Sequence, residues 1–219
     1  MERKTVISLI SFSVIIIILL FCFDFNLYSS KSKTISYDEN GIIFSITAFD
    51  GDNESEPFVQ CLGHAWVSVD NRSGHSIYIK NSEIKNNEII AFSVWALSGH
   101  RGVAFNLEPA FISNYDRYVG RQSLSMNINE SQLAEIEDYI DRNDNWTFGK
   151  NCSYWSIQLW NELADDDYKL KTPVFICTPK KVQKALHEFD CVETDKDFSK
   201  AGGVFFYLNE NRTELSLCS

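Results

Sequence analysis

A thiol and an imidazole are the two side chains in this sequence whose surroundings favour chemistry. Cys152 follows Asn151, a good N-cap residue, and precedes apolar residues with helical spacing, so a helix is predicted to begin at the thiol. The partial positive charge of a helix N-terminus favours thiolate over thiol. Far upstream, His64 follows Gly63 and opens an apolar, strand-like run. If the fold brings His64 to Cys152, the two form an activated nucleophile and its base.

A third polar group normally holds the imidazole of such a pair in position. Residues 63–71 and 75–81 read as two strands, and the turn signal NRSG between them predicts a hairpin. In that hairpin the residues opposite His64 lie near Asn81 and Ser82. We therefore expect one of these two side chains to orient the ring.

Other residues are candidates for supporting roles around the pair. His100 and Glu108 are possible partners behind the imidazole. The backbone N–H of Cys152 is a candidate oxyanion donor, because N–H groups at a helix start have no partner within the helix. Asn151, Trp155 and Trp66 are expected to line the oxyanion site or substrate groove.

The order of the predicted elements indicates an α+β fold. Apolar, β-branched and aromatic runs predict strands, and N-cap signals followed by apolar stripes predict helices. The predicted strands cover residues 41–49, 63–71, 75–81, 88–97 and 123–128, helices open after Asn129, Asn151 and Thr178, and a hairpin covers 203–209 and 213–218.

The N-terminus carries an uncharged apolar run, residues 5–23. At about 1.5 Å per residue a helix of this run spans roughly 28 Å, close to the thickness of a bilayer core. We expect an uncleaved signal anchor over residues 1–24, a stalk over 25–40, and one domain over 41–219 outside the cytoplasm. Cleavage near residues 28–30, which would release a secreted protein, is the alternative.

Charge and cysteine content indicate which ligands and cross-links to expect. The formal net charge of −10 argues against nucleic-acid binding. Without a C-x-x-C pair a structural zinc site is not expected, and we expect neither metal nor cofactor. If Cys152 is the free thiol, an extracytoplasmic setting allows the other cysteines beyond the apolar run to form two disulfides, and these are Cys61, Cys177, Cys191 and Cys218.

The order of the two segments GHAWVSV and NCSYWSIQLWN resembles the circularly permuted branch of NlpC/P60-type papain-like proteins, which includes lecithin:retinol acyltransferase-like proteins. In that branch the histidine strand precedes the cysteine helix. The segment HRGVAFNLE is also similar to one in secreted bacterial relatives with the same plan. The resemblance implies an antiparallel sheet packed on helices, with Cys152 as nucleophile and His64 as base. The third residue departs from the family pattern.

Three functions follow as hypotheses. The first is an anchored cysteine hydrolase, an amidase or peptidase, acting on peptide amides, with cell-wall peptides as candidate substrates. The second is a lipid-directed acyltransferase or thioesterase that uses the same acyl intermediate. The third is a disulfide-stapled surface binding module without catalysis, in which Cys152 is bridged or buried and far from a histidine.

Overall fold

The computed structural model describes residues 32–51, 63–97, 99–173, 176–208 and 211–215. The predicted membrane segment, residues 5–23, lies outside these ranges. Within them, no helix is both long enough and apolar enough to cross a bilayer. The compact unit runs from Lys33 to Ser219. Residues 33–40, which the sequence placed in the stalk, therefore belong to it.

The centre of the fold is an antiparallel sheet, as the α+β interpretation of the sequence expects. Its strand order is β10-β9-β6-β5-β2-β1-β7-β8, and β3 and β4 form a separate pair. The strands are β1 (Ile42–Phe49), β2 (His64–Asn71), β3 (Ile77–Ile79), β4 (Ser82–Ile84), β5 (Ile89–Leu97), β6 (His100–Phe105), β7 (Gln122–Ile128), β8 (Glu193–Thr194), β9 (Phe205–Leu208) and β10 (Asn211–Glu214).

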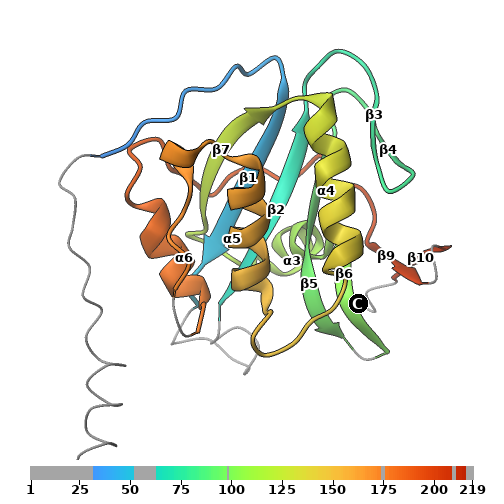
Figure 1. Cartoon of the computed structure of the whole chain (residues 1–219). Coiled ribbons are helices and arrows are strands. Elements are labelled where there is room, and N and C mark those ends of the chain that lie inside the picture. The colour runs from blue at the N-terminus through green and yellow to red at the C-terminus, as the bar shows by residue number, and fades with distance from the viewer. Residues whose placement is uncertain (1–31, 52–62, 98, 174–175, 209–210, 216–219) are drawn as a thin grey trace, which may run out of the picture. The chain divides into compact units, whose positions relative to one another are not determined.

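Helices cover both faces of this sheet. Figure 1 shows α4, α5 and α6 in front of the sheet and α3 behind it. Successive side chains of β2 point to opposite faces of the sheet. Ala65 and Val67 belong to the core under the front helices, whereas Trp66 belongs to a cluster with Phe198. The helices are α3 (Leu107–Tyr115), α4 (Glu130–Arg142), α5 (Cys152–Leu163) and α6 (Pro179–Leu186), with a 3-10 turn at Asp166–Tyr168.

The predicted N-caps of the three front helices are confirmed. Asn129 and Gln132 form a reciprocal capping box at α4, and the Thr178 side chain caps α6. At α5 the Tyr154 N–H donates to Asn151 Oδ1 at 3.0 Å. Each cap pairs an otherwise unpaired N–H of the first turn, and α5 therefore begins at Cys152 as expected.

The predicted hairpin between residues 63–71 and 75–81 is wrong. β2 pairs with β1 and β5 instead, and β3 pairs with β4 across a tight turn at Lys80 and Asn81, whose φ values are 50° and 60°. Two successive left-handed residues are what a two-residue turn of this twist requires. β2 is buried along its whole length, so its hydrogen-bonding edges are satisfied by two long strands rather than by a short return strand.

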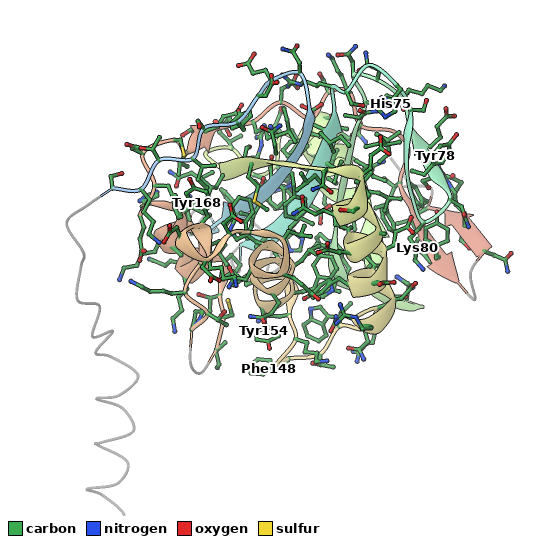
Figure 2. All side chains as sticks on the ribbon, turned by 45° about the horizontal axis from the view of Figure 1, so that its top comes forward. His75, Tyr78, Lys80, Phe148, Tyr154 and Tyr168 are labelled. Carbon is green, nitrogen blue, oxygen red and sulfur yellow. The ribbon has the colours of Figure 1, made fainter. Side chains whose placement is uncertain are left out.

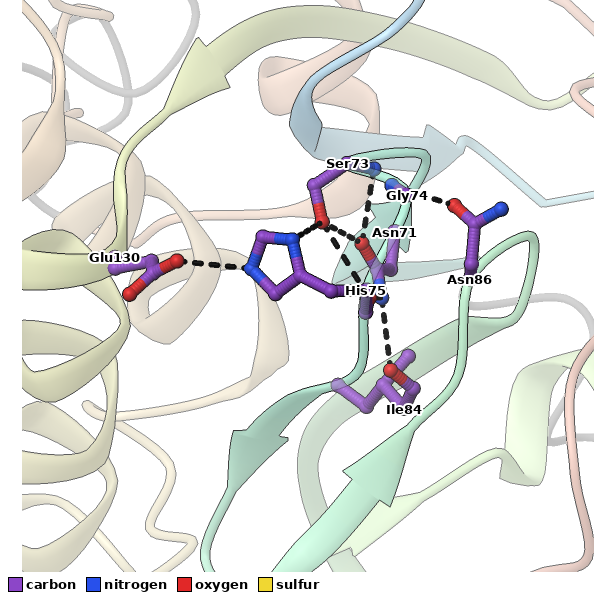
Figure 3. A network of polar contacts seen from close by, with 7 residues as sticks. All are labelled: Asn71, Ser73, Gly74, His75, Ile84, Asn86 and Glu130. Atoms are coloured by element: carbon purple, nitrogen blue, oxygen red, sulfur yellow. Dashed lines mark hydrogen bonds and ion pairs between the residues drawn. The ribbon is translucent and has the colours of Figure 1, made fainter.

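Asn71 closes the loop that leaves the sheet after β2 (Figure 3). Its side-chain amide donates to the backbone oxygens of His75 at 2.7 Å and Ile84 at 2.8 Å. Beside it, His75 Nε2 bonds to Glu130 Oε1 at 2.9 Å and links this loop to the start of α4. His75 therefore lies at the end of β2 opposite to His64.

Candidate active site

Asn151 fixes the position of the candidate nucleophile. Besides capping α5, its Nδ2 donates to the backbone oxygen of Cys177 at 2.8 Å, which ties the helix start to the segment before α6. Cys152 is a free, partly exposed thiol. As the first residue of α5, it has a backbone N–H outside the helical hydrogen-bond ladder.

The surroundings of Cys152 favour its thiolate. Burial raises the pKa of the thiol, but the positive charge of His64 and a hydrogen bond with it outweigh burial and lower the pKa below the ordinary value. The Ala65 N–H and the Ser153 hydroxyl add to the lowering. The Ala65 contact also places the sulfur at the first residues of β2, where the candidate base lies.

Gly63 determines how the chain enters β2 at His64. Its φ is +67°, and a Cβ there would lie 2.3 Å from the Phe49 backbone oxygen. A side chain at residue 63 would therefore force the entry of β2 away from β1. His64 pairs with Phe49 across the two strands, and its side chain is 7% exposed.

Glu108 holds the imidazole of His64. His64 Nε2 and Glu108 Oε1 lie 2.8 Å apart, and Trp95 Nε1 donates to the same oxygen at 2.8 Å. Burial lowers the pKa of His64, but the charge and hydrogen bond of Cys152, together with those of Glu108, raise it to about 9. With Nε2 occupied by Glu108, Nδ1 is the ring nitrogen left for the thiolate.

Asn106 positions the helix that carries Glu108. It has the left-handed φ of 58°, its Oδ1 accepts from the Ala91 N–H at 3.0 Å, and its Nδ2 donates to the Gly203 oxygen at 3.2 Å. These bonds tie the start of α3 to β5 and to the segment before β9. The helix thereby delivers Glu108 to the rear face of the sheet, beside His64.

Aromatic rings surround the imidazole. Ring centroids of Trp95, Trp66 and Tyr118 lie 4.1, 6.0 and 6.1 Å from that of His64. The expectation that Trp66 and Trp155 line a groove is wrong, because they are 0% and 1% exposed. Trp66 excludes water from the histidine, and Trp155 belongs to the core under α5.

The structure does not bring Asn81 or Ser82 to the imidazole. Ser82 bonds to Tyr207 at 2.9 Å and accepts from Arg212 at 3.2 Å, while Asn81 lies in the β3–β4 turn beside a surface cavity. Figure 2 shows Lys80, next to Asn81, well away from Tyr154 in the first turn of α5. The expectation depended on the hairpin that does not form, and it fails with that hairpin.

His100 also lies apart from the pair. Its Nε2 bonds to the Val103 backbone oxygen at 3.1 Å, and its ring stacks on Phe206 with centroids 4.2 Å apart. Of the candidate partners for His64, only Glu108 lies within hydrogen-bond distance of its imidazole.

The remaining described cysteines are free thiols. Cys177 and Cys191 form no bridge, while Cys61 and Cys218 lie outside the described residues. Burial, with the nearby charge of Cys152, raises the pKa of Cys177 to about 12, so Cys177 stays a neutral thiol beside the reactive one.

The described part of the chain contains no cluster of three His, Cys, Asp or Glu side chains that could hold a metal ion.

No protein-family model, curated protein or solved structure matches this chain. The side chains of the candidate site are therefore the evidence for its function.

Proposed function

We propose that this protein is a cysteine-dependent hydrolase that cleaves an acyl bond. The observation that carries the proposal is the position of His64, which bonds to buried Glu108 on one side and interacts with Cys152 on the other. A nucleophile, a base and a group that orients the base are the three parts that thiol hydrolysis requires.

The chemistry needs no cofactor. The Cys152 thiolate attacks the substrate carbonyl carbon, and the carbonyl π electrons move to the oxygen. When the intermediate collapses, the bond to the leaving nitrogen or oxygen breaks and the His64 imidazolium gives that atom its proton. The resulting thioester is attacked by water as neutral His64 accepts a water proton. Release of the acid regenerates the thiolate beside the imidazolium.

The order of the parts supports a permuted papain-like domain as the fold. The histidine stands at the start of a sheet strand and the cysteine opens a later helix packed on that sheet. On this interpretation the substrates are peptide amides, with those of the cell wall as the candidate source. Their hydrolysis would occur outside the cytoplasm at a membrane to which residues 5–23 anchor the chain.

A lipid-directed thioesterase or acyltransferase is the second candidate. Phe148, four residues before Cys152, is 72% exposed, and Ile176, next to Cys177, is 37% exposed. Figure 2 shows Phe148 near Tyr154, at the start of α5. Exposed apolar side chains on both segments beside the thiol suit an acyl chain. Analysis of the products separates the two candidates: a free peptide amine indicates the hydrolase, and acyl transfer to a second substrate indicates the acyltransferase.

The non-catalytic binding module is less well supported. It expects Cys152 to be bridged or buried, with histidines far from it. Instead, the thiol is free and partly exposed, and His64 interacts with it.

Alkylation of the full-length protein by iodoacetamide tests the proposal. We expect Cys152 to label faster than Cys191, with an apparent pKa below the ordinary thiol value of about 8.5. In His64→Ala that pKa rises, because the positive charge that favours the thiolate is gone. The Cys152→Ser variant identifies the labelled site. Slow labelling with an ordinary pKa, or a pKa unchanged in His64→Ala, would contradict the proposal.

A further inference from the structure

Tyr118 lies against His64 but takes no part in the proposed proton transfers. Its ring centroid is 6.1 Å from that of His64, 5.3 Å from that of Trp66 and 5.6 Å from that of Phe49. These three rings belong to the adjoining ends of β1 and β2. The phenol ring is thereby held at the end of the sheet where Cys152 lies.

The backbone of Tyr118 is held in an uncommon conformation. Its φ is +59°, in the left-handed region that bulky side chains rarely adopt. Its carbonyl oxygen accepts from the Arg121 N–H at 3.1 Å and from Arg121 Nη1 at 3.3 Å, and the guanidinium also pairs with Asp195 at 3.1 Å. Backbone strain of this kind concentrates at functional sites, where surrounding contacts maintain it.

The hydroxyl of Tyr118 forms no hydrogen bond with any residue that the structure describes. Burial, with the negative charges of Glu108 and Cys152, raises the pKa of the phenol above its ordinary value. The group therefore remains a neutral O–H across the pH range in which the thiolate exists. Among the described residues this neutral donor has no partner, so it is available to a substrate oxygen.

Acyl transfer is accelerated by such a donor. When the Cys152 thiolate adds to a carbonyl, the oxygen becomes an anion, and donors placed in advance lower the barrier. The free N–H of Cys152 at the start of α5 supplies one hydrogen bond. Neither the Cys152 thiolate nor the His64 imidazolium, which protonates the leaving group, supplies a second hydrogen bond to the oxyanion.

We propose that Tyr118 is a catalytic residue whose hydroxyl donates the second hydrogen bond to the oxyanion. This inference rests on the proposed acyl-transfer function. The alternative acceptor for the Tyr118 hydroxyl is Glu108 Oε2, which is buried and has no hydrogen-bond partner among the described residues. A bond to that oxygen would make Tyr118 a positioning residue, and the two roles differ in their kinetics.

Two probes of the same thiol distinguish these roles in Tyr118→Phe, which keeps the ring and removes the hydroxyl. Iodoacetamide alkylates a thiolate by displacement without forming an oxyanion. p-Nitrophenyl acetate acetylates it through a tetrahedral oxyanion and releases nitrophenolate. We expect alkylation of Tyr118→Phe to keep the wild-type rate and pH profile, whereas the acetylation rate falls about 10²- to 10³-fold. Tyr78→Phe, at a 57% exposed tyrosine on β3, is the matched control and is expected to change neither rate.

The other outcomes are decisive as well. Acetylation of Tyr118→Phe at the wild-type rate would overturn the oxyanion role. An equal fall of both rates, or a shift of the alkylation pKa, would also overturn it and make Tyr118 a positioning residue. If wild-type Cys152 alkylates as a low-pKa thiolate but is not acetylated, the proposed acyl-transfer function fails and this inference fails with it.

Discussion

The reactivity of Cys152 depends on two proton equilibria that shift in opposite directions. The pKa of the thiol is lowered and that of His64 is raised to about 9, so the thiolate–imidazolium pair persists between them. Acylation requires the thiolate as nucleophile and the imidazolium as proton donor. We expect a bell-shaped pH dependence of the acylation rate with a peptide p-nitroanilide, whose leaving nitrogen takes up that proton, with an acid limb below the ordinary thiol value and an alkaline limb near pH 9. A single limb near pH 8.5 would show an isolated thiol.

Glu108 sets the position of the alkaline limb. In Glu108→Gln the side chain keeps its shape but loses the negative charge that favours the imidazolium, so the pKa of His64 falls below about 9. We expect the alkaline limb to move to lower pH and the acylation rate at its optimum to fall about 10²-fold. The measurement is the same pH profile.

Glu130→Gln is the matched control, because Glu130 also bonds a histidine, His75, but at an exposed site at the other end of β2 (Figure 3). It is expected to leave the profile unchanged. An alkaline limb in Glu108→Gln at the wild-type pH would refute the role of Glu108.

The sequence singles out some of these residues better than others. Cys152 is found from local signals, since its N-cap and the helical spacing lie within a few residues of it. Glu108 is found only as one candidate among several. Its approach to His64 depends on α3 crossing to the rear face of the sheet, which no local pattern encodes.

At the scale of the helix, Asn151 couples stability to reactivity. Asn151→Ala removes the cap of α5 and the bond to the Cys177 oxygen, and we expect a loss of about 1 kcal/mol in the free energy of unfolding. The start of the helix also frays around the thiol, so the alkylation pKa of Cys152 is expected to rise. Chemical denaturation and labelling of the same sample measure both.

Asn129→Ala provides the comparison, because it removes the equivalent cap from α4. A similar loss of stability without a change in the alkylation pKa is expected there. If both variants raise the pKa equally, the effect of Asn151 is global rather than local.

Helices that open with a local cap signal are predicted correctly, and the helix without one is not. α4, α5 and α6 each begin with a side-chain cap that is visible in the sequence. α3 begins after Asn106, which is left-handed and makes no side-chain cap, so the usual signature is absent. The partners of β2 are missed for a different reason: strand pairing depends on the whole sheet, whereas a turn signal is local.

At the scale of the whole molecule, the beginning of the folded unit is the feature in which sequence and structure differ most. Residues 33–40 are polar and resemble a linker, yet Lys33 pairs with the chain after α6, donating to the Glu188 oxygen at 2.9 Å and accepting from the Asp190 N–H at 3.1 Å. Ile35 follows and is 4% exposed within the main core. One buried side chain in a polar run is too weak a pattern to mark a core segment.

Ile35→Ala tests whether this segment is part of the folded domain. Removing a buried isoleucine leaves a cavity in the core, and we expect the free energy of unfolding to fall by about 2–5 kcal/mol. Denaturant unfolding of the full chain measures the change, with Val119→Ala as control, since Val119 is 67% exposed and its truncation is expected to cost less than about 0.5 kcal/mol. Equal stabilities of Ile35→Ala and wild type would return residues 33–40 to the stalk. A loss in the expected range would mean that a fragment made for the active-site assays has to begin before Lys33, because one beginning at residue 41 lacks part of its own core.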